Sequence, residues 1–345
     1  MENIPQLTIV MPFYNQKEMV SEMIDSILAN EFQNWELLAI DDGSSQETID
    51  FLAHYQKDQR IRIIKRTANP KGAQTCRNMG MEIAQGNYIV FFDSDDYITS
   101  TCLSTRIKFI EQRPDLDFAV FPSGIYKDGI FSCNASKQIY GYPIYMDDVA
   151  AFSRKTLPFI VWNNIYRTES LRRFQMTWDP NLLSLQDSEF NMQALIKGLK
   201  YDYAHSQPNY GYRIATTGSV SKKITTNGHR KSHLYLIEKQ YKEVIQKYGR
   251  KYNHDLYLGV LYVFTVTMPN GIDFTFAKDL ADIVRRYDPF RGRLLVYKIR
   301  LCKFLGLIVN PKIARQLSMP LFLIKKLWAE KTLLNRITIT RNKFE

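Results

Sequence analysis

Carboxylates are crowded at two places in the first hundred residues. One run reads AIDDGS (39–44) and the other reads FFDSDD (91–96). Each follows an apolar stretch typical of a β-strand, and a similar stretch runs into MPFYN (11–15). Five carboxylates brought to one place repel one another and are costly to bury, so they need a cation. Mg²⁺ or Mn²⁺ suits oxygen ligands and keeps coordination positions open for a diphosphate.

The elements around these runs alternate between strand-like and helix-like segments. Pro12 is expected to end the first strand, and Asn15 with Glu18 resembles a capping box for the first helix. A βαβ order requires a parallel sheet with helices on its faces, and ligands bind beyond the carboxyl ends of such strands. The expected strands are 7–11, 36–40, 61–65 and 88–92, and the expected helices start after Asn15, near Ser44 or Ser45, and at Gln74.

Each acidic run also has a simpler interpretation when taken by itself. Asp, Gly and Ser are common in tight turns and at helix caps, which would account for AIDDGS. The second run would then be a solvated acidic loop. Their order along the chain, each at a predicted strand end, favours a shared site instead.

Four segments resemble the signature of glycosyltransferase family 2, in that family's order and over about the first 220 residues. They are IVMPFYN (9–15), AIDDGS (39–44), KGAQTCRNMGMEIAQGNYIVFFDSDD (71–96) and LQDSEF (185–190). The resemblance implies an α/β fold of the GT-A type, a Rossmann-like and mostly parallel sheet flanked by helices, followed by a helical C-terminal region. It also implies a nucleotide-sugar donor and a divalent cation, Mn²⁺ or Mg²⁺.

The same resemblance implies a set of donor-binding residues. Asp42 would hydrogen-bond the nucleotide base, which makes a UDP-sugar the expected donor. Asp95 and Asp96 match the DXD-like element that holds the ribose and the metal, and which of the two ligates the metal stays open. Arg77 would contact the nucleotide or a phosphate, or else be a surface arginine paired with an acid. The remaining expected donor contacts are Pro12, Phe13, Tyr14, Asn15, Asn78 and Asp93.

Catalysis is expected at Asp187, which matches the acidic residue that serves the family as general base. One carboxylate within reach of an acceptor hydroxyl is enough for a single displacement with inversion. Gln186 stands where the family usually has glutamate, and it could hydrogen-bond an acceptor, while Glu189 is an alternative base. WNNIYR (162–167) resembles an acceptor-side segment, so Trp162 is an acceptor candidate, although aromatic residues also build cores. YRIATTGSVS (212–221) resembles a loop over the diphosphate.

Positive charge is confined to the C-terminal end. The chain carries a net charge of +11, and residues 285–345 hold 15 Lys/Arg against three acids. Basic amphipathic stretches at 294–307 and 313–328 predict peripheral contact with an anionic membrane, or a helix packed on the catalytic domain with its charges in solvent. We expect a catalytic domain over 1–225 and a helical region over 226–345.

Other features narrow the choice of function and location. Four dispersed cysteines suggest neither a zinc site nor a disulfide framework, and no signal peptide or membrane span is expected. No nucleic-acid recognition motif accompanies the charge. The expected protein is a transferase in the cytoplasm or at the inner face of the cell membrane. It would act on a saccharide or lipid-linked saccharide in polysaccharide biosynthesis of the cell envelope. A non-catalytic nucleotide-sugar-binding scaffold is the alternative.

Overall fold

The computed structural model describes residues 4–132, 140–144, 146–213, 226–266 and 273–308. Contacts divide the chain into two compact units. The first comprises 1–143, 158–181 and 193–215, and the second comprises 144–157, 182–192 and 216–345. The segments 144–157 and 182–192 therefore belong to the second unit. The predicted division into a catalytic domain over 1–225 and a helical region over 226–345 stays a prediction.

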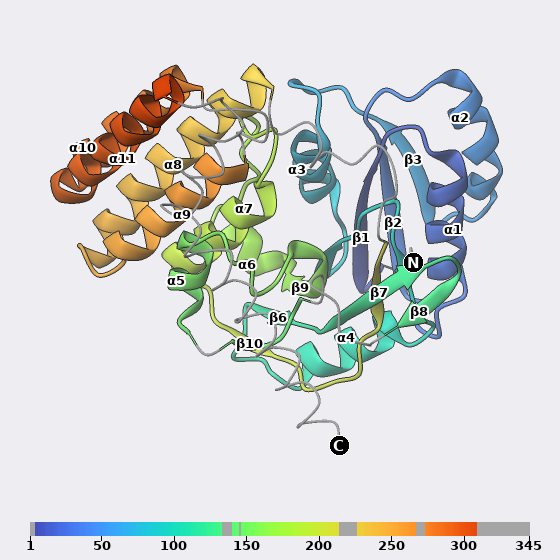
Figure 1. Cartoon of the computed structure of the whole chain (residues 1–345). Coiled ribbons are helices and arrows are strands. Elements are labelled where there is room, and N and C mark those ends of the chain that lie inside the picture. The colour runs from blue at the N-terminus through green and yellow to red at the C-terminus, as the bar shows by residue number, and fades with distance from the viewer. Residues whose placement is uncertain (1–3, 133–139, 145, 214–225, 267–272, 309–345) are drawn as a thin grey trace. The chain divides into compact units, whose positions relative to one another are not determined.

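A seven-stranded mixed sheet forms the core of the first unit (Figure 1). The order is β10-β6-β9-β4-β1-β2-β3, and β1 pairs in parallel with both β2 and β4. Every residue of β1 and β2 is buried, as expected for strands covered on both faces. The strands are β1 (Leu7–Phe13), β2 (Trp35–Asp41), β3 (Ile61–Lys65), β4 (Tyr88–Phe91), β6 (Phe118–Val120), β9 (Asn164–Arg167) and β10 (Tyr201–Tyr203).

This sheet confirms the predicted α/β fold class, and it adds an antiparallel strand that the sequence did not reveal. The first four strands form the expected parallel array, whereas β9 runs antiparallel to β4 and β6. Helix α3 covers one face of the sheet, and α1 and α2 cover the other (Figure 1). The helices of this unit are α1 (Lys17–Leu28), α2 (Gln46–Leu52), α3 (Ala73–Ile83), α4 (Cys102–Glu111) and α6 (Thr168–Arg173), with short 3₁₀ turns η1 (Ala53–Lys57) and η2 (Val161–Asn163).

Helix α3 approaches the sheet closely because Gly80 has no side chain. A Cβ atom at this position would lie 2.3 Å from Cγ1 of Val10 on β1, which is far inside van der Waals contact. The close approach fixes the N-terminal half of α3, including Arg77, near the carboxyl ends of the central strands.

A second, four-stranded sheet lies in the same unit, in the order β5-β11-β7-β8. Strand β11 pairs antiparallel with β5 and in parallel with β7. Because β5 follows β4 after only a short acidic loop, this sheet brings β11 to the FDSDD segment. The strands are β5 (Tyr97–Ile98), β7 (Ser123–Lys127), β8 (Ile130–Ser132) and β11 (Tyr210–Arg213).

Two local predictions near the first strand are wrong. Pro12 does not end β1, which runs on to Phe13. Its pairing with β4 stops at Val10, so Pro12 lies where the strand is paired on one side only, and such positions tolerate proline. Asn15 does not cap α1 either; the cap position is Gln16, which has left-handed backbone and no capping hydrogen bond from its side chain. Helix α2 does begin after Ser45, whose hydroxyl accepts from the N–H of Thr48, as predicted.

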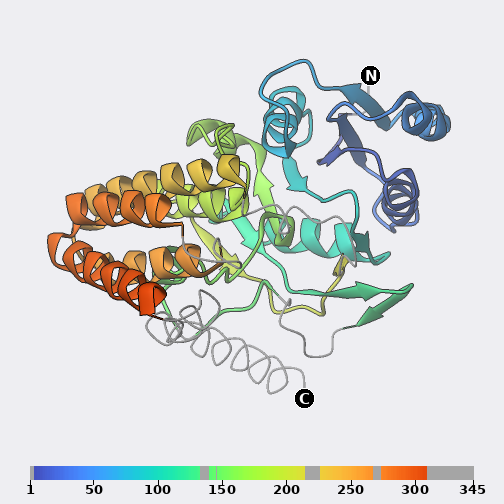
Figure 2. The same cartoon turned by 45° about the horizontal axis from the view of Figure 1, so that its top comes forward.

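The second unit is helical. Its helices α8, α9, α10 and α11 lie side by side (Figures 1 and 2), and α10 and α11 form the most extensive pair. Within the described residues the C-terminal region is helical, as expected, and α11 covers the predicted stretch 294–307, whereas the stretch 313–328 lies outside the described residues. The elements are α5 (Asp148–Ser153), the start of α7 (Gln186–Lys197), α8 (Asn227–Tyr248), α9 (Asn253–Val266), α10 (Phe274–Tyr287) and α11 (Pro289–Ile308).

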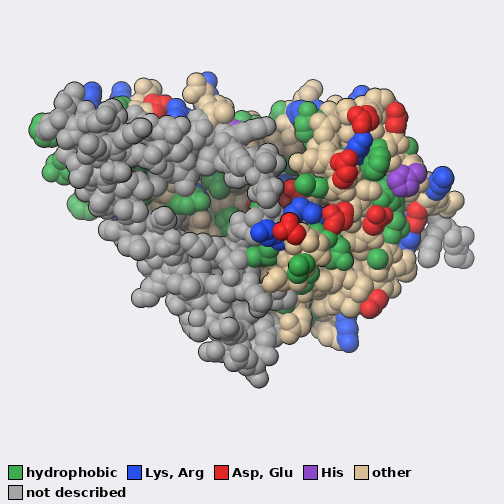
Figure 3. All heavy atoms as spheres, turned by 45° about the vertical axis from the view of Figure 1, so that its right-hand side comes forward, with side chains coloured by type: hydrophobic (Ala, Val, Ile, Leu, Met, Phe, Trp, Pro, Cys, Tyr) green, Lys and Arg blue, Asp and Glu red, His purple; other side chains and the backbone are tan. Residues whose placement is uncertain are grey.

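Charged groups of both signs are interspersed on the face of the first unit shown in Figure 3, in keeping with the near neutrality of residues 1–284. Within the described residues, no helix has the length and apolar character needed to cross a membrane.

Lys155 carries a buried amine in the second unit. Its ammonium donates to the side-chain oxygen of Gln240 on α8, and burial lowers the pKa of Lys155 from 10.5 to about 7. Below pH 7 both folded and unfolded states are protonated, so the folded state bears the full cost of the buried charge. Between pH 7 and 10.5 the unfolded state holds more protons, so stability rises with pH.

Replacing Lys155 by methionine should therefore stabilise the protein at pH 7. We expect the free energy of unfolding to increase by about 1–3 kcal/mol, because the buried charge is removed and only one hydrogen bond is lost. The gain should shrink as the pH approaches 10, measured by urea denaturation across that range. Lys242→Met, at an exposed position of α8, is the control. Parallel pH profiles for wild type and Lys155→Met would contradict the prediction.

Candidate active site

The loops after β1 and β2 are tied to each other through Asn15. Its backbone N–H donates to the hydroxyl of Ser44 at 2.8 Å, and its side-chain oxygen accepts from the N–H of Ser45 at 2.9 Å. Asn15 has a positive φ of 54°, a conformation that asparagine tolerates better than most residues. These bonds are the physical reason that Asn15 is not a helix cap. Asn15 thus joins the loop after β1 to the loop after β2, which begins at Asp41 and Asp42.

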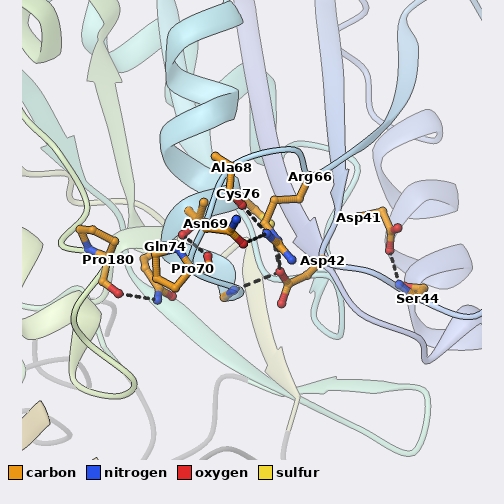
Figure 4. Close-up of polar contacts among 12 residues, drawn as sticks. Asp41, Asp42, Ser44, Arg66, Ala68, Asn69, Pro70, Gln74, Cys76 and Pro180 are labelled. Atoms are coloured by element: carbon orange, nitrogen blue, oxygen red, sulfur yellow. Dashed lines mark hydrogen bonds and ion pairs between the residues drawn. The ribbon is translucent and has the colours of Figure 1, made fainter. Parts of the chain in front are cut away.

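One oxygen of the Asp42 carboxylate is held by an arginine side chain. Arg66 donates from Nε to Oδ1 of Asp42 at 2.7 Å (Figure 4). The N–H of Gly72 donates to the same oxygen at 3.0 Å. The thiol of Cys76 also contacts Oδ1, at 3.8 Å. Among the described residues nothing hydrogen-bonds Oδ2, so this oxygen is available to a ligand. Arg66 is fixed in turn by the carbonyl of Ala68, as Figure 4 shows.

Tyr14 is the exposed member of the predicted base pocket. Its side chain is 50% exposed, and the ammonium of Lys71 lies 3.5 Å from the centre of its ring. Pro12 and Phe13 are buried within β1, and donor contacts by Pro12, Phe13 and Tyr14 stay predictions.

Arg77 and Asn78 on α3 are both engaged within the first unit. Arg77 donates to Asp93 at 2.6 Å, and its guanidinium lies 4.4 Å from the ring centre of Trp178. The amide of Asn78 exchanges two 2.8 Å hydrogen bonds with the backbone of Trp178. The ion pair that was the alternative for Arg77 is therefore present, although the arginine is buried. Direct donor contacts by Arg77 and Asn78 stay predictions.

Asp95 and Asp96 differ sharply in their surroundings. Asp96 is 1% exposed, and its carboxylate accepts from the hydroxyl of Tyr210 and from the N–H of Arg213, both at 2.7 Å. The Arg213 guanidinium donates to the carbonyl of Asp95 at 2.5 Å and to Glu22 on α1 at 2.6 Å. The first of these bonds is to the backbone of Asp95, and in the described part of the chain no group of another residue hydrogen-bonds its carboxylate.

Burial and mutual repulsion act on both carboxylates. Burial, with a smaller contribution from Asp93, raises the pKa of Asp95 to about 6. Burial also raises the pKa of Asp96 well above its usual range, and the neighbouring Asp95 and Asp93 add to the effect. Buried carboxylates with raised pKa values bind a cation readily, because the cation offsets the cost of their ionised form.

The prediction that five crowded carboxylates share one cation needs correction. Asp42 and Asp93 are paired with arginines, and the side chain of Asp41 accepts from the N–H of Ser44 at 2.8 Å. Across the described residues, no three His, Cys, Asp or Glu side chains are grouped to hold a metal by themselves. A site of one or two carboxylates still fits Mg²⁺ or Mn²⁺, because such ions are commonly completed by substrate phosphates and water.

Asp187 and its neighbours belong to the second unit. Asp187 lies in the first turn of α7 and is partly exposed, where the helix dipole favours a carboxylate. Gln186 donates from its side chain to the carbonyl of Leu182 at 3.0 Å. Glu189 is 2% exposed and forms a 2.7 Å ion pair with Lys239 on α8. Glu189 is therefore a buried, neutralised carboxylate, and the choice between Asp187 and Glu189 as base stays a prediction.

The aromatic acceptor candidate lies in the core. Trp162 is 2% exposed and stacks on Tyr210 and Tyr212, with ring centres 4.7 and 5.8 Å away. This agrees with the core alternative, and a contact between Trp162 and an acceptor stays a prediction. The segment YRIATTGSVS (212–221), which resembles a loop over the diphosphate, lies outside the described residues beyond Arg213.

Three residues of the site were not among the predicted ones: Arg66, Tyr210 and Arg213. Arg66 directly follows β3, so the rule that places ligands beyond strand ends would have found it if applied to the third strand. Tyr210 and Arg213 lie on β11, whose pairing with β5 has no short-range sequence signal.

The fold and the acidic strand ends define a GT-A type α/β protein, and a family model supports this. Residues 8–174 match the model of the family Glycosyl transferase family 2. A poly(ribitol-phosphate) beta-glucosyltransferase of Bacillus spizizenii is 28% identical over 208 residues, which are 57% of this chain and 32% of the relative. The chain covers between 32% and 56% of the length of three curated relatives that it matches.

Solved structures share the fold at low sequence identity. Residues 1–349 of Staphylococcus aureus TarS, in complex with UDP-GlcNAc, superpose with a TM-score of 0.67 at 17% identity, covering 91% of this chain and 90% of that one. The mannosyltransferase PcManGT from Pyrobaculum calidifontis, with GDP-Man and Mn²⁺, gives a TM-score of 0.52 at 16% identity, with 96% and 87% covered.

The Tyr210 hydroxyl should be a structural requirement of the acidic loop. It accepts from the N–H of Asp93 at 3.2 Å and donates to Asp96. We expect Tyr210→Phe to lower the free energy of unfolding by about 1–3 kcal/mol, since a buried carboxylate loses a donor. Tyr212→Phe on the same strand is the matched control, because no described residue hydrogen-bonds its hydroxyl. Equal unfolding curves for the two variants would refute this role.

Proposed function

We propose that the chain transfers a sugar from a UDP-sugar, with inversion, to a saccharide or lipid-linked saccharide acceptor in polysaccharide biosynthesis. One observation carries the proposal. At the carboxyl ends of β2 and β4, on either side of β1, Oδ2 of Asp42 and the carboxylate of Asp95 remain available while the other acids are paired. A nucleoside diphosphate with its cation presents the complementary groups, an imide N–H and a bound metal.

Asp42 suits the base of the nucleotide. Arg66 and the N–H of Gly72 both use Oδ1, which orients the carboxylate and leaves Oδ2 to accept from the imide N–H of uracil. Asp42 and Tyr14 follow neighbouring strands, β2 and β1. The solved structure of TarS holds UDP-GlcNAc, which supports a UDP-sugar as the donor.

Asp95 is the proposed metal ligand, and Asp96 the residue that positions it. The carboxylate of Asp96 is occupied by Tyr210 and Arg213, whereas that of Asp95 is not. A bound Mg²⁺ or Mn²⁺ would offset the charge that develops on the leaving diphosphate. The Mn²⁺ in the PcManGT structure supports this choice of cation. Arg77 forms an ion pair with Asp93 and so neutralises that carboxylate in the same loop.

Asp187 is the proposed general base. Its partial exposure and its place in the first turn of α7 suit an ionised carboxylate that takes a proton from an acceptor hydroxyl. Glu189 is held by Lys239, so the ion pair would have to break before it could act. In the proposed mechanism a single base acts and the sugar is transferred in one displacement, which inverts the anomeric configuration.

The donor site should lose its response to metal when Asp95 is changed. Asp95→Asn is expected to weaken binding of UDP in the presence of Mn²⁺ about ten-fold or more, the size of one lost charge-assisted contact. Binding without metal should change little, because the asparagine keeps the side-chain shape. Isothermal titration with and without Mn²⁺ measures both. If Asp96→Asn loses the metal response and Asp95→Asn keeps it, the two roles are reversed.

Turnover should depend on Asp187 and not on Glu189. We expect Asp187→Asn to lower the rate of donor turnover by about 100-fold to 10,000-fold, as for loss of a general base, with UDP affinity retained. Glu189→Gln is the matched control and should retain most of the rate. Release of UDP from a panel of UDP-sugars, with saccharide acceptors, is the measurement. A wild type that binds UDP with metal yet turns over none of them would favour the scaffold alternative.

A further inference from the structure

Helix α11 has two apolar faces, and among the described residues only one of them is packed against another element. Its inward face packs on α10, where a Cβ at Gly292 would lie 2.3 Å from the Cα of Arg285. Leu295 and Cys302 are buried on this face. The opposite face carries large exposed side chains, namely Phe290 at 75%, Leu294 at 38%, Tyr297 at 66% and Phe304 at 58%.

These four residues, called here the α11 stripe, form one line along the helix. They are separated by four, three and seven residues, the spacing that places side chains on one helical face. Exposed aromatic side chains in such a line are costly in water and mark an interaction surface. Phe274, at the start of α10, is also 38% exposed, and the ammonium of Lys303 lies 5.9 Å from the centre of its ring.

The charge of α11 is of one sign. Residues 289–308 contain five Lys or Arg and no Asp or Glu. Arg291 is paired with Asp288 on the buried side at 2.7 Å. Arg293 and Arg300 are exposed, and each lies four residues before a member of the stripe, so they flank it along one edge. The partner of this face must therefore be apolar at its centre and anionic at its rim.

We propose that the α11 stripe docks on the surface of an anionic lipid bilayer, with its aromatic side chains at the level of the lipid headgroups. Phe, Tyr and Leu between cationic side chains are the composition of helices that lie in that interface. The inference rests on the second unit alone and does not depend on transferase activity.

Two other possible partners of the α11 stripe match the positive charge of α11 less well. Residues 309–345 carry eight Lys or Arg and two Glu, so they would bring positive charge to a positive helix. A second copy of the chain, paired about a two-fold axis, would place the two sets of arginines on one shared interface. In both arrangements positive charges would repel one another at the edge of the α11 stripe, whereas anionic lipid headgroups would attract the arginines of α11.

Vesicle flotation with the full chain tests the proposal. The probes are phosphatidylcholine vesicles with and without about 30% phosphatidylglycerol, at low and high salt. The variants are Phe290→Ser/Tyr297→Ser, which breaks the stripe, and Arg293→Glu/Arg300→Glu, which reverses the flanking charge. The controls are Phe51→Ser, an exposed aromatic residue of α2, and Lys242→Glu/Arg250→Glu, which makes the same charge change elsewhere in the second unit.

We expect wild type and controls to bind the anionic vesicles, more weakly at high salt, and both α11 variants to bind about ten-fold less or worse. Circular dichroism should show unchanged helix content. Binding that persists in both α11 variants would assign the membrane contact to residues 309–345 and overturn the proposal. Absence of wild-type binding would overturn it too, as would a wild-type dimer in size-exclusion chromatography that the stripe variant converts to monomer.

Discussion

The buried carboxylate of Asp96 joins the two sheets of the first unit. It follows β4 of the large sheet and accepts hydrogen bonds from Tyr210 and Arg213, both on β11 of the small sheet. A carboxylate so deeply buried is tolerated only when such donors are in place. The acidic loop and the small sheet therefore require each other. Arg213 extends the connection to Glu22 on α1, so the loop is held from two directions.

Pairing of charges decides what the site can bind. Arginines neutralise Asp42 and Asp93, so the negative charge left at the carboxyl ends of β2 and β4 is smaller and more local than the sequence suggests. What remains is Asp95, whose backbone is fixed by Arg213 while its side chain stays available. A rigid backbone beneath an unpaired carboxylate is a good arrangement for a metal ligand, because binding costs little ordering.

Much of the fold could be predicted because buried parallel strands are continuous apolar runs. The third strand, 61–65, was predicted with its observed bounds, and the helix expected to start near Ser44 or Ser45 begins after Ser45. The errors at Pro12 and Asn15 arose where tertiary pairing overrides local preference. Asn15 bonds Ser44 and Ser45 from the next loop, some thirty residues away, and no local pattern announces such a bond.

The site was predicted less completely, for a related reason. Residue types at strand ends indicated Asp42, Asp95 and Asp96. Whether each carboxylate is paired or available depends on which residues the order of the strands brings next to it. Arg66 comes to Asp42 because β3 lies beside β2, and Tyr210 comes to Asp96 because β11 pairs with β5. Strand order across two sheets is a long-range property, and one sequence contains little information about it.

The helical unit bears on the choice between Asp187 and Glu189, which the sequence left open. Lys239 on α8 binds Glu189, and the segment before Asp187 is fixed to the same helix. There the N–H of Leu183 donates to Ser232 at 3.0 Å, and Ser184 is bonded to His233 at 2.8 Å. Burial lowers the pKa of His233 to about 4, so its ring is neutral near pH 7 and this bond persists there. Helix α8 thus neutralises Glu189 and orients the segment that carries Asp187. The C-terminal region is therefore part of the proposed catalytic apparatus.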